Sequence, residues 1–174
     1  MAESSERFAL YAQTIIEITL PDGSTVSASR GHEPPSALQD LLPLVVITAW
    51  NPAGELREPE ANHAAHQKML ALLGHQAGGG EPLRILNAVG RSPDGSHWEE
   101  SAAIHGLALE DAIALARQLR QDAIFEITDG GNRSDHLPRL TGPRRPTRAR
   151  RWRPSPFVLG ELSSLALVGA AGRA

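Results

Sequence analysis

The stretch Leu44-Val-Val-Ile-Thr-Ala-Trp-Asn51-Pro52 is the longest apolar run in a chain that proline and glycine otherwise interrupt. Its content of Val, Ile and Thr over a short length predicts a buried central strand rather than a helix. A residue that precedes proline is disfavoured in the helical region, and an asparagine side chain can bond nearby backbone, so Asn51-Pro52 predicts a turn. We expect the rest of the domain to pack around this strand.

The composition fits a globular protein with one folded domain. The chain has 174 residues, of which 41% are hydrophobic, and it contains no cysteine. It can therefore bury a sizeable core without disulfides, and a thiolate metal site or a cysteine nucleophile is excluded. The first residues, Met-Ala-Glu-Ser-Ser-Glu-Arg, lack the basic start and apolar core typical of a secretory signal, and no apolar run approaches the about 20 residues of a membrane span. We expect a cytoplasmic protein without membrane contact, and nothing in the sequence indicates a cofactor or the oligomeric state.

Charge is distributed unevenly along the chain. Residues 1–138 contain 9 basic and 19 acidic residues, a formal charge of −10, whereas residues 139–174 contain 8 basic residues and 1 acidic residue, a charge of +7. The second segment is also rich in proline and arginine, a composition that cannot build a core. We expect a single domain over residues 1–138 and a flexible basic tail over 139–174, with an apolar end that could dock on the domain.

Residue patterns within 1–138 predict the order β-β-β-α-β-β-α-β. The expected strands cover residues 14–20, 25–29, 44–51, 83–89, 98–104 and 123–127, and the expected helices cover 59–74 and 109–119. Residues 36–42 are expected to form one helical turn. This order predicts an α+β fold, in which two helices pack on one face of a mainly antiparallel sheet.

Glu100 is conspicuous within the strand expected at 98–104. Alternation places it on the same face as Trp98, Ala102 and Ile104, which is the apolar face. A carboxylate that points inward is costly unless it is paired or hydrogen-bonded. It could serve as a general acid or base, or as an acceptor that orients a ligand. Alternatively it accepts from backbone amides or pairs with Arg84, and a register error of one residue would place it in solvent.

Two asparagines are natural companions of this carboxylate. Asn51 ends the central strand, and Asn62 lies in the first turn of the following helix, on its core-facing flank. With Glu100 they could converge at one end of the sheet, where a helix N-terminus also offers free amides. The alternative is that Asn51 only forms a turn and Asn62 only bonds the loop.

Four short motifs carry a family resemblance. They are Ile47-Thr-Ala-Trp-Asn-Pro52, Glu60-Ala-Asn62 at a helix start, Trp98-Glu-Glu-Ser101 and Leu119-Arg-Gln-Asp-Ala-Ile-Phe125. In this order, over residues 11–127, they resemble a small bacterial family known as domain of unknown function 3293. The resemblance implies no activity but a shared polar set of Asn51, Asn62, Glu100, Ser101 and Gln121. This sequence departs from the family pattern at Leu119-Arg120, where Phe-Gly is expected, and the resemblance does not cover the tail.

Other patterns do not predict a metal site or a catalytic triad. His63 and His66 diverge by about 60° around a helix and lack a third ligand, so we expect edge or solvated histidines. His97-Trp-Glu99 has the spacing of zinc deaminases, yet the required cysteine pair is absent. Ser101 has no suitably spaced His and Asp for a triad.

Two functions therefore remain open. The first is a small-ligand-binding or catalytic domain with a polar pocket at the end of the central strand, where Glu100 is the acid, base or acceptor. Asn51, Asn62, Ser101 and Gln121 would then bind the ligand. The second is an interaction module whose tail contacts nucleic acid or an acidic protein. Its contact residues would be Arg144, Arg145, Arg148, Arg150, Arg151, Trp152 and Arg153.

Overall fold

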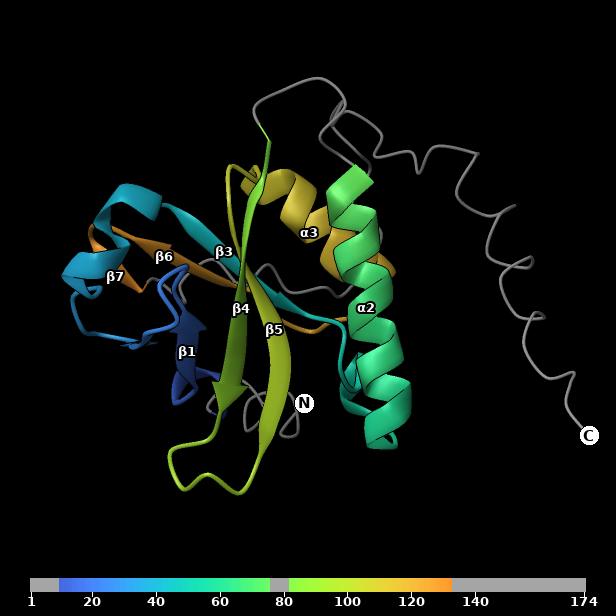
Figure 1. The fold of residues 1–174 in the computed structure, drawn as a ribbon. Helices are drawn as coiled ribbons and strands as arrows, with labels where there is room; N and C mark the ends of the chain where they lie inside the picture. The colour runs from blue at the N-terminus through green and yellow to red at the C-terminus, as the bar shows by residue number, and fades with distance from the viewer. Residues whose placement is uncertain (1–9, 76–81, 133–174) are drawn as a thin grey trace, which may run out of the picture.

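The structure, a computed structural model, describes residues 10–75 and 82–132 (Figure 1). Within these residues the fold is α+β, with a mainly antiparallel sheet and two α-helices on one face, as the sequence predicts. The sheet has seven strands in the order β2-β1-β4-β5-β3-β6-β7, and every pair is antiparallel. The apolar stretch of the sequence forms β3, between β5 and β6.

The expected elements are present with small shifts at their ends. The strands are β1 (Ile15–Thr19), β2 (Thr25–Ser29), β3 (Leu44–Thr48), β4 (Arg84–Arg91), β5 (Trp98–His105), β6 (Phe125–Thr128) and β7 (Gly131–Asn132). The α-helices are α2 (Pro59–His75) and α3 (Leu109–Gln118), and two short 3-10 helices are η1 (Ser36–Leu41) and η2 (Pro52–Gly54). Strand β7 was not predicted, because two residues carry no periodicity.

Strand β3 is buried on both sides because the sheet carries a layer on each face. On one side, which we call the helix face, Val45 and Ile47 pack against Met69 and Leu73 of α2 and Leu115 of α3. On the other side, the opposite face, a second cluster surrounds the remaining residues of β3. It includes Leu44, Val46, Ile16, Leu38, Ala103 and Ile127. A run of consecutive buried residues, rather than an alternating pattern, is therefore what β3 requires.

Figure 1 shows how the layers are arranged around the β4–β5 hairpin. Helices α2 and α3 lie together on one side of this hairpin, and β1, β6 and β7 lie on the other side. The β1–β2 hairpin continues the sheet beyond β4. The opposite face is thus bounded by strands and short helices instead of by long helices.

No helix within 10–75 and 82–132 is both long enough and apolar enough to cross a membrane. The expected domain boundary at residue 138 and the tail over 139–174, including all seven candidate nucleic-acid contacts, lie outside the described residues.

Candidate functional site

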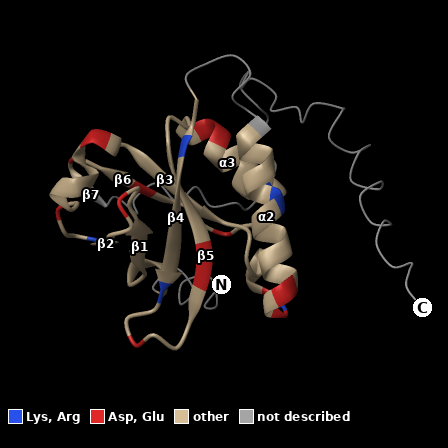
Figure 2. Cartoon of the chain, viewed as in Figure 1, with Lys and Arg blue, Asp and Glu red and all other residues tan. Residues whose placement is uncertain are grey.

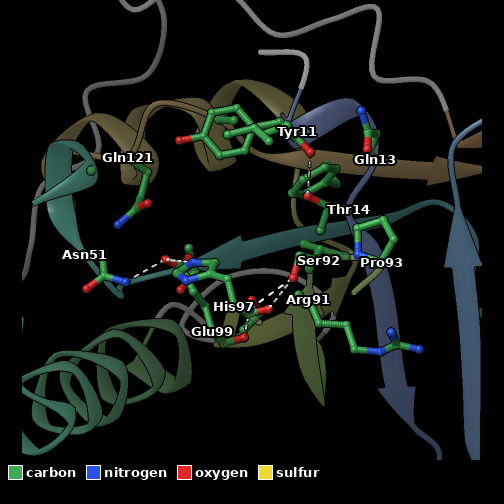
Figure 3. Close-up of a pocket in the computed structure, with 18 of the residues that line it drawn as sticks. Tyr11, Gln13, Thr14, Asn51, Arg91, Ser92, Pro93, His97, Glu99 and Gln121 are labelled. Atoms are coloured by element: carbon green, nitrogen blue, oxygen red, sulfur yellow. Dashed lines mark hydrogen bonds and ion pairs between the residues drawn. The ribbon is translucent and has the colours of Figure 1, made fainter. Parts of the chain in front are cut away.

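A cavity of about 660 Å³ opens on the opposite face, where β3 ends (Figure 3). Strands β3, β4 and β5 form its floor, and the segment at residues 10–14 forms its roof, where the Tyr11 ring lies across the cavity from Glu99. A Cβ atom on Gly90 would lie 3.9 Å from Ser101 Oγ and 3.6 Å from Thr14 Cγ2. Glycine at this position therefore keeps the floor open.

The way the chain leaves β3 places Asn51 at the cavity. The Thr48 hydroxyl donates to the Glu100 carbonyl oxygen at 2.7 Å and accepts from the Trp50 N–H at 3.0 Å. The Thr48 side chain thereby takes the place of the backbone hydrogen bonds that would continue the β3–β5 pairing beyond Thr48. Asn51 then adopts the left-handed region, with φ 45°, before the chain turns into η2. Asparagine tolerates this conformation better than most residues, as the sequence argument for a turn requires.

Asn62 fixes the orientation of the Asn51 side chain. The backbone N–H of Asn51 donates to Asn62 Oδ1 at 2.9 Å, and the backbone N–H of Arg57 donates to Asn51 Oδ1 at 3.1 Å. Because a backbone N–H can only donate, both acceptors must be amide oxygens, and each amide has one possible orientation. Asn62 Nδ2 then donates to Asn51 Oδ1 at 2.9 Å. Asn62 is 2% exposed and lies behind the cavity wall, whereas Asn51 lines the cavity.

The C-terminus of α3 delivers Gln121 to the same wall. The N–H of Arg120 bonds the Arg117 carbonyl and the N–H of Gln121 bonds the Ala116 carbonyl, which is the Schellman pattern that ends a helix. Arg120 occupies the left-handed position of this motif, with φ 56°. Gln121 Nε2 donates to the Trp50 carbonyl at 2.8 Å, so its Oε1 atom remains an acceptor at the cavity.

Glu99 and His97 complete the polar side of the cavity. Glu99 Oε1 accepts from Asn51 Nδ2 at 2.8 Å and lies 3.2 Å from His97 Nε2. At the rim, Asp94 accepts from the hydroxyls of Ser92 and Ser96 and from the Ser96 N–H, and these bonds lower the pKa of Asp94 to about 2. The Asp94 carboxylate is therefore ionised at neutral pH.

The cavity lies in a part of the chain that a family model recognises. Residues 47–124 match the model of a family described as Protein of unknown function (DUF3293). This segment belongs to that family. The match confirms the family resemblance seen in the sequence, over residues 47–124 of the expected 11–127, and this DUF3293 segment contains the cavity residues Asn51, Glu99, Ser101 and Gln121. The comparisons with curated proteins and with solved structures find no match.

Within the DUF3293 segment, Glu100 lies on the helix face, as alternation predicts, and does not line the cavity. Its Oε2 atom is 3.0 Å from His63 Nδ1 of α2, and its side chain is 31% exposed. Arg84, the alternative partner, lies opposite His105 at the other end of the β4–β5 ladder. Glu100 therefore does not join Asn51 in the cavity. Asn51 Nδ2 bonds Glu99 Oε1 instead, because Glu99 and Glu100 are consecutive strand residues and project to opposite faces.

His66, one turn after His63 in α2, is buried. His66 is 6% exposed, and its Nδ1 atom has no hydrogen-bond partner among the described residues. Burial lowers the pKa of His66, the Glu100 carboxylate opposes this shift, and His63 adds to it. Within the described part of the chain, no group of three or more His, Asp or Glu side chains is placed to hold a metal ion.

Of the residues expected at the site, the structure brings Asn51, Ser101 and Gln121 to the cavity wall, with Asn62 behind them. Sequence reasoning considered Glu99 and His97 only together, as a zinc-deaminase spacing that the missing cysteine pair rules out, and did not predict either residue at the cavity. A signal was present, because a two-residue period puts Glu99 on the same face as Ser101. The apolar neighbours of Glu100 drew attention to the other face.

Proposed function

We propose that the DUF3293 segment forms a domain that binds a small polar molecule in the cavity at the end of β3. The observation that carries the proposal is the arrangement of Asn51, Glu99 and Gln121, whose polar atoms point into one cavity and are held by other bonds. Side chains that are already oriented lose little conformational entropy when a ligand binds. Pockets of 300–1,000 Å³ with a few convergent polar groups are typical of small-molecule sites, and this one has about 660 Å³.

Backbone conformation around the cavity supports the same proposal. Asn51, Ala53 and Arg120 all have positive φ, and the Ala53 N–H donates to the Arg120 carbonyl at 2.6 Å. A residue such as Ala or Arg in the left-handed region costs on the order of 1 kcal/mol relative to glycine. Strain of this kind is retained where it positions functional groups. Here the hydrogen bond between the strained residues Ala53 and Arg120 joins the loop after β3 to the end of α3.

The cavity also holds groups that proton transfer requires. Glu99 is the carboxylate in the cavity, where the sequence analysis expected Glu100. His97 Nε2 lies 3.2 Å from Glu99 Oε1. A carboxylate and an imidazole next to a bound molecule can act as base and acid. A catalytic role is therefore compatible with the binding role, and Glu99 is the residue that would carry it.

A variant that fills the cavity tests the binding proposal. Gly90→Leu places a side chain on the floor, where a Cβ is accommodated at ordinary contact distance. A diverse set of small polar fragments, screened by ligand-observed NMR, is expected to yield binders to the wild type that do not bind Gly90→Leu. The control is Gly74→Leu on α2, where a Cβ meets open space. Fragments that bind Gly90→Leu as well as the wild type would contradict the proposal, provided that urea unfolding shows both variants folded.

The second candidate, an interaction module, rests on the charge asymmetry of the sequence, +7 in residues 139–174 against −10 in the remainder. It predicts that the protein binds a nucleic acid or an acidic protein, that binding weakens steeply with salt, and that removing residues 139–174 abolishes it. The cavity proposal predicts that the same truncation leaves fragment binding unchanged. Both measurements on one truncated protein separate the two candidates.

A further inference from the structure

The charges around the cavity are not balanced. Arg91 lines it, but its Nε atom is 2.6 Å from Glu17 Oε1, and its guanidinium points away from the cavity centre (Figure 3). Among residues 10–75 and 82–132, no arginine or lysine forms an ion pair with the carboxylate of Glu99 or Asp94, although His97 lies beside Glu99. Figure 2 shows acidic residues on β5 and in the β4–β5 loop; of these, Glu99 and Asp94 line the cavity. The cavity therefore offers a negative potential to a ligand.

The hydrogen-bonding groups that remain for a ligand are mainly acceptors. Asn51 Oδ1 is already used by Asn62 and by the Arg57 N–H, so Asn51 offers the cavity only its Nδ2 group. Gln121 offers Oε1, since its Nε2 is bonded to the Trp50 carbonyl. Glu99 offers Oε2, because both contacts of its carboxylate with described residues involve Oε1. A ligand that satisfies these atoms must bring at least two donors.

The wall also contains apolar surface. Val46, Ala123 and Phe125 line the cavity, and the ring of Tyr11 lies across it from Glu99. An apolar or aromatic body of the ligand would contact these side chains while its polar end reaches Glu99. Aromatic faces next to a carboxylate are favourable surroundings for an organic nitrogen cation.

We propose that the cavity takes a small organic cation, such as a protonated amine or an amidinium on an apolar body, with Glu99 as its counter-ion. This inference rests on the proposed small-ligand function. A planar amidinium would donate to Glu99 Oε2 and to Gln121 Oε1, and its apolar body would lie toward Phe125. Charge-assisted bonds to a carboxylate are about twice as strong as neutral ones, so charge selects the ligand.

Three probes of equal shape test the charge requirement on the full-length protein. Benzamidinium, benzamide and benzoate share a phenyl body and differ in the charge and donors of the planar group. Ligand-observed NMR titration is expected to give a dissociation constant for benzamidinium at least about tenfold lower than for benzamide, with no binding of benzoate.

Two glutamine variants locate the counter-ion. In Glu99→Gln, an amide oxygen still accepts from Asn51, so the wall is retained while the charge is removed. This variant is expected to lose the preference for benzamidinium over benzamide. Glu100→Gln is the matched control, because it removes one charge from the neighbouring residue on the other face, and it is expected to keep the preference.

The outcomes separate the inference from the proposed function. If benzamide or benzoate binds as tightly as benzamidinium, and Gly90→Leu abolishes that binding, the small-ligand function stands and the cation inference is wrong. If benzamidinium binds equally to Glu99→Gln and to the wild type, Glu99 is not the counter-ion and the inference is overturned. If none of the three binds, the cation inference falls, and the wider fragment screen decides on the small-ligand function.

Discussion

Glu99 and Glu100 are consecutive residues of β5, and their carboxylates lie on opposite faces of the sheet. Glu99 Oε1 accepts from Asn51 Nδ2 at 2.8 Å in the cavity, whereas Glu100 Oε2 lies 3.0 Å from His63 Nδ1 beside α2. The chain thus contains two acidic residues of the same type, one peptide unit apart, in different surroundings. The same substitution at both positions separates an effect on the cavity from an effect of charge.

Glu100→Gln is expected to change the free energy of unfolding by less than about 1 kcal/mol at pH 7. The side chains of His63 and Glu100 are 57% and 31% exposed, and ion pairs in contact with solvent contribute little. Urea unfolding of the wild type and the variant at equal slope measures the difference. A loss of about 2 kcal/mol or more would instead identify Glu100 as a structural partner of α2.

Asn62→Asp is expected to destabilise the fold by at least about 2 kcal/mol. The new carboxylate cannot donate, so its second oxygen would face the oxygens of Asn51 and of the Arg57 carbonyl inside a buried site. Asn87→Asp, at an exposed position of β4, is the control and is expected to have little effect. Equal urea midpoints for the two variants would show that the Asn51–Asn62 pair does not hold the loop.

Arg120→Gly is expected to stabilise the fold by about 0.5–1 kcal/mol. Arg120 adopts φ 56° at the position of the Schellman motif that glycine normally occupies, and its contact with Glu55 is exposed. Arg117→Gly, within the last turn of α3, is expected to cost about 1 kcal/mol, because glycine is a poor helix former. Thermal unfolding of both variants tests whether Arg120→Gly raises the melting temperature and Arg117→Gly lowers it. A loss of stability in Arg120→Gly would mean that the arginine side chain outweighs the strain.

His66 is expected to make stability depend on pH. Its pKa is lower in the folded protein than the ordinary value of 6.5, so the unfolded chain takes up a proton first as the pH falls. The free energy of unfolding should then decrease as the pH drops below about 6.5 and through the folded pKa. Glu100 on β5 and His63 on α2 are the charged groups that act on it.

The variant His66→Leu isolates this contribution. Its stability relative to the wild type should improve as the pH is lowered from 7.5 to 5, because the leucine cannot be protonated in either state. Urea unfolding across this pH range measures the difference. A difference that is constant with pH would show that His66 titrates alike in the folded and unfolded chain.

The local sequence determined the secondary-structure elements of this protein. The apolar run at residues 44–48, the turn residues after β1 and the proline at the start of α2 each have a preferred backbone conformation, so short-range physics fixes strand, turn and helix. Alternation likewise determined that Glu100 shares a face with Ala102 and Ile104 and that Ser101 does not. Burial of Asn62 followed from its place on the inner flank of α2.

Only the tertiary structure decided which face of the sheet holds the cavity. Both faces of β3 are buried, so its sequence contains no signal that separates them. The cavity exists because β4, β5 and the segment at residues 10–14 surround the end of β3, and because the Schellman turn of α3 brings Gln121 to the Trp50 carbonyl. These contacts join residues that are far apart in the chain, and their geometry depends on sheet curvature and on left-handed residues that periodicity does not encode.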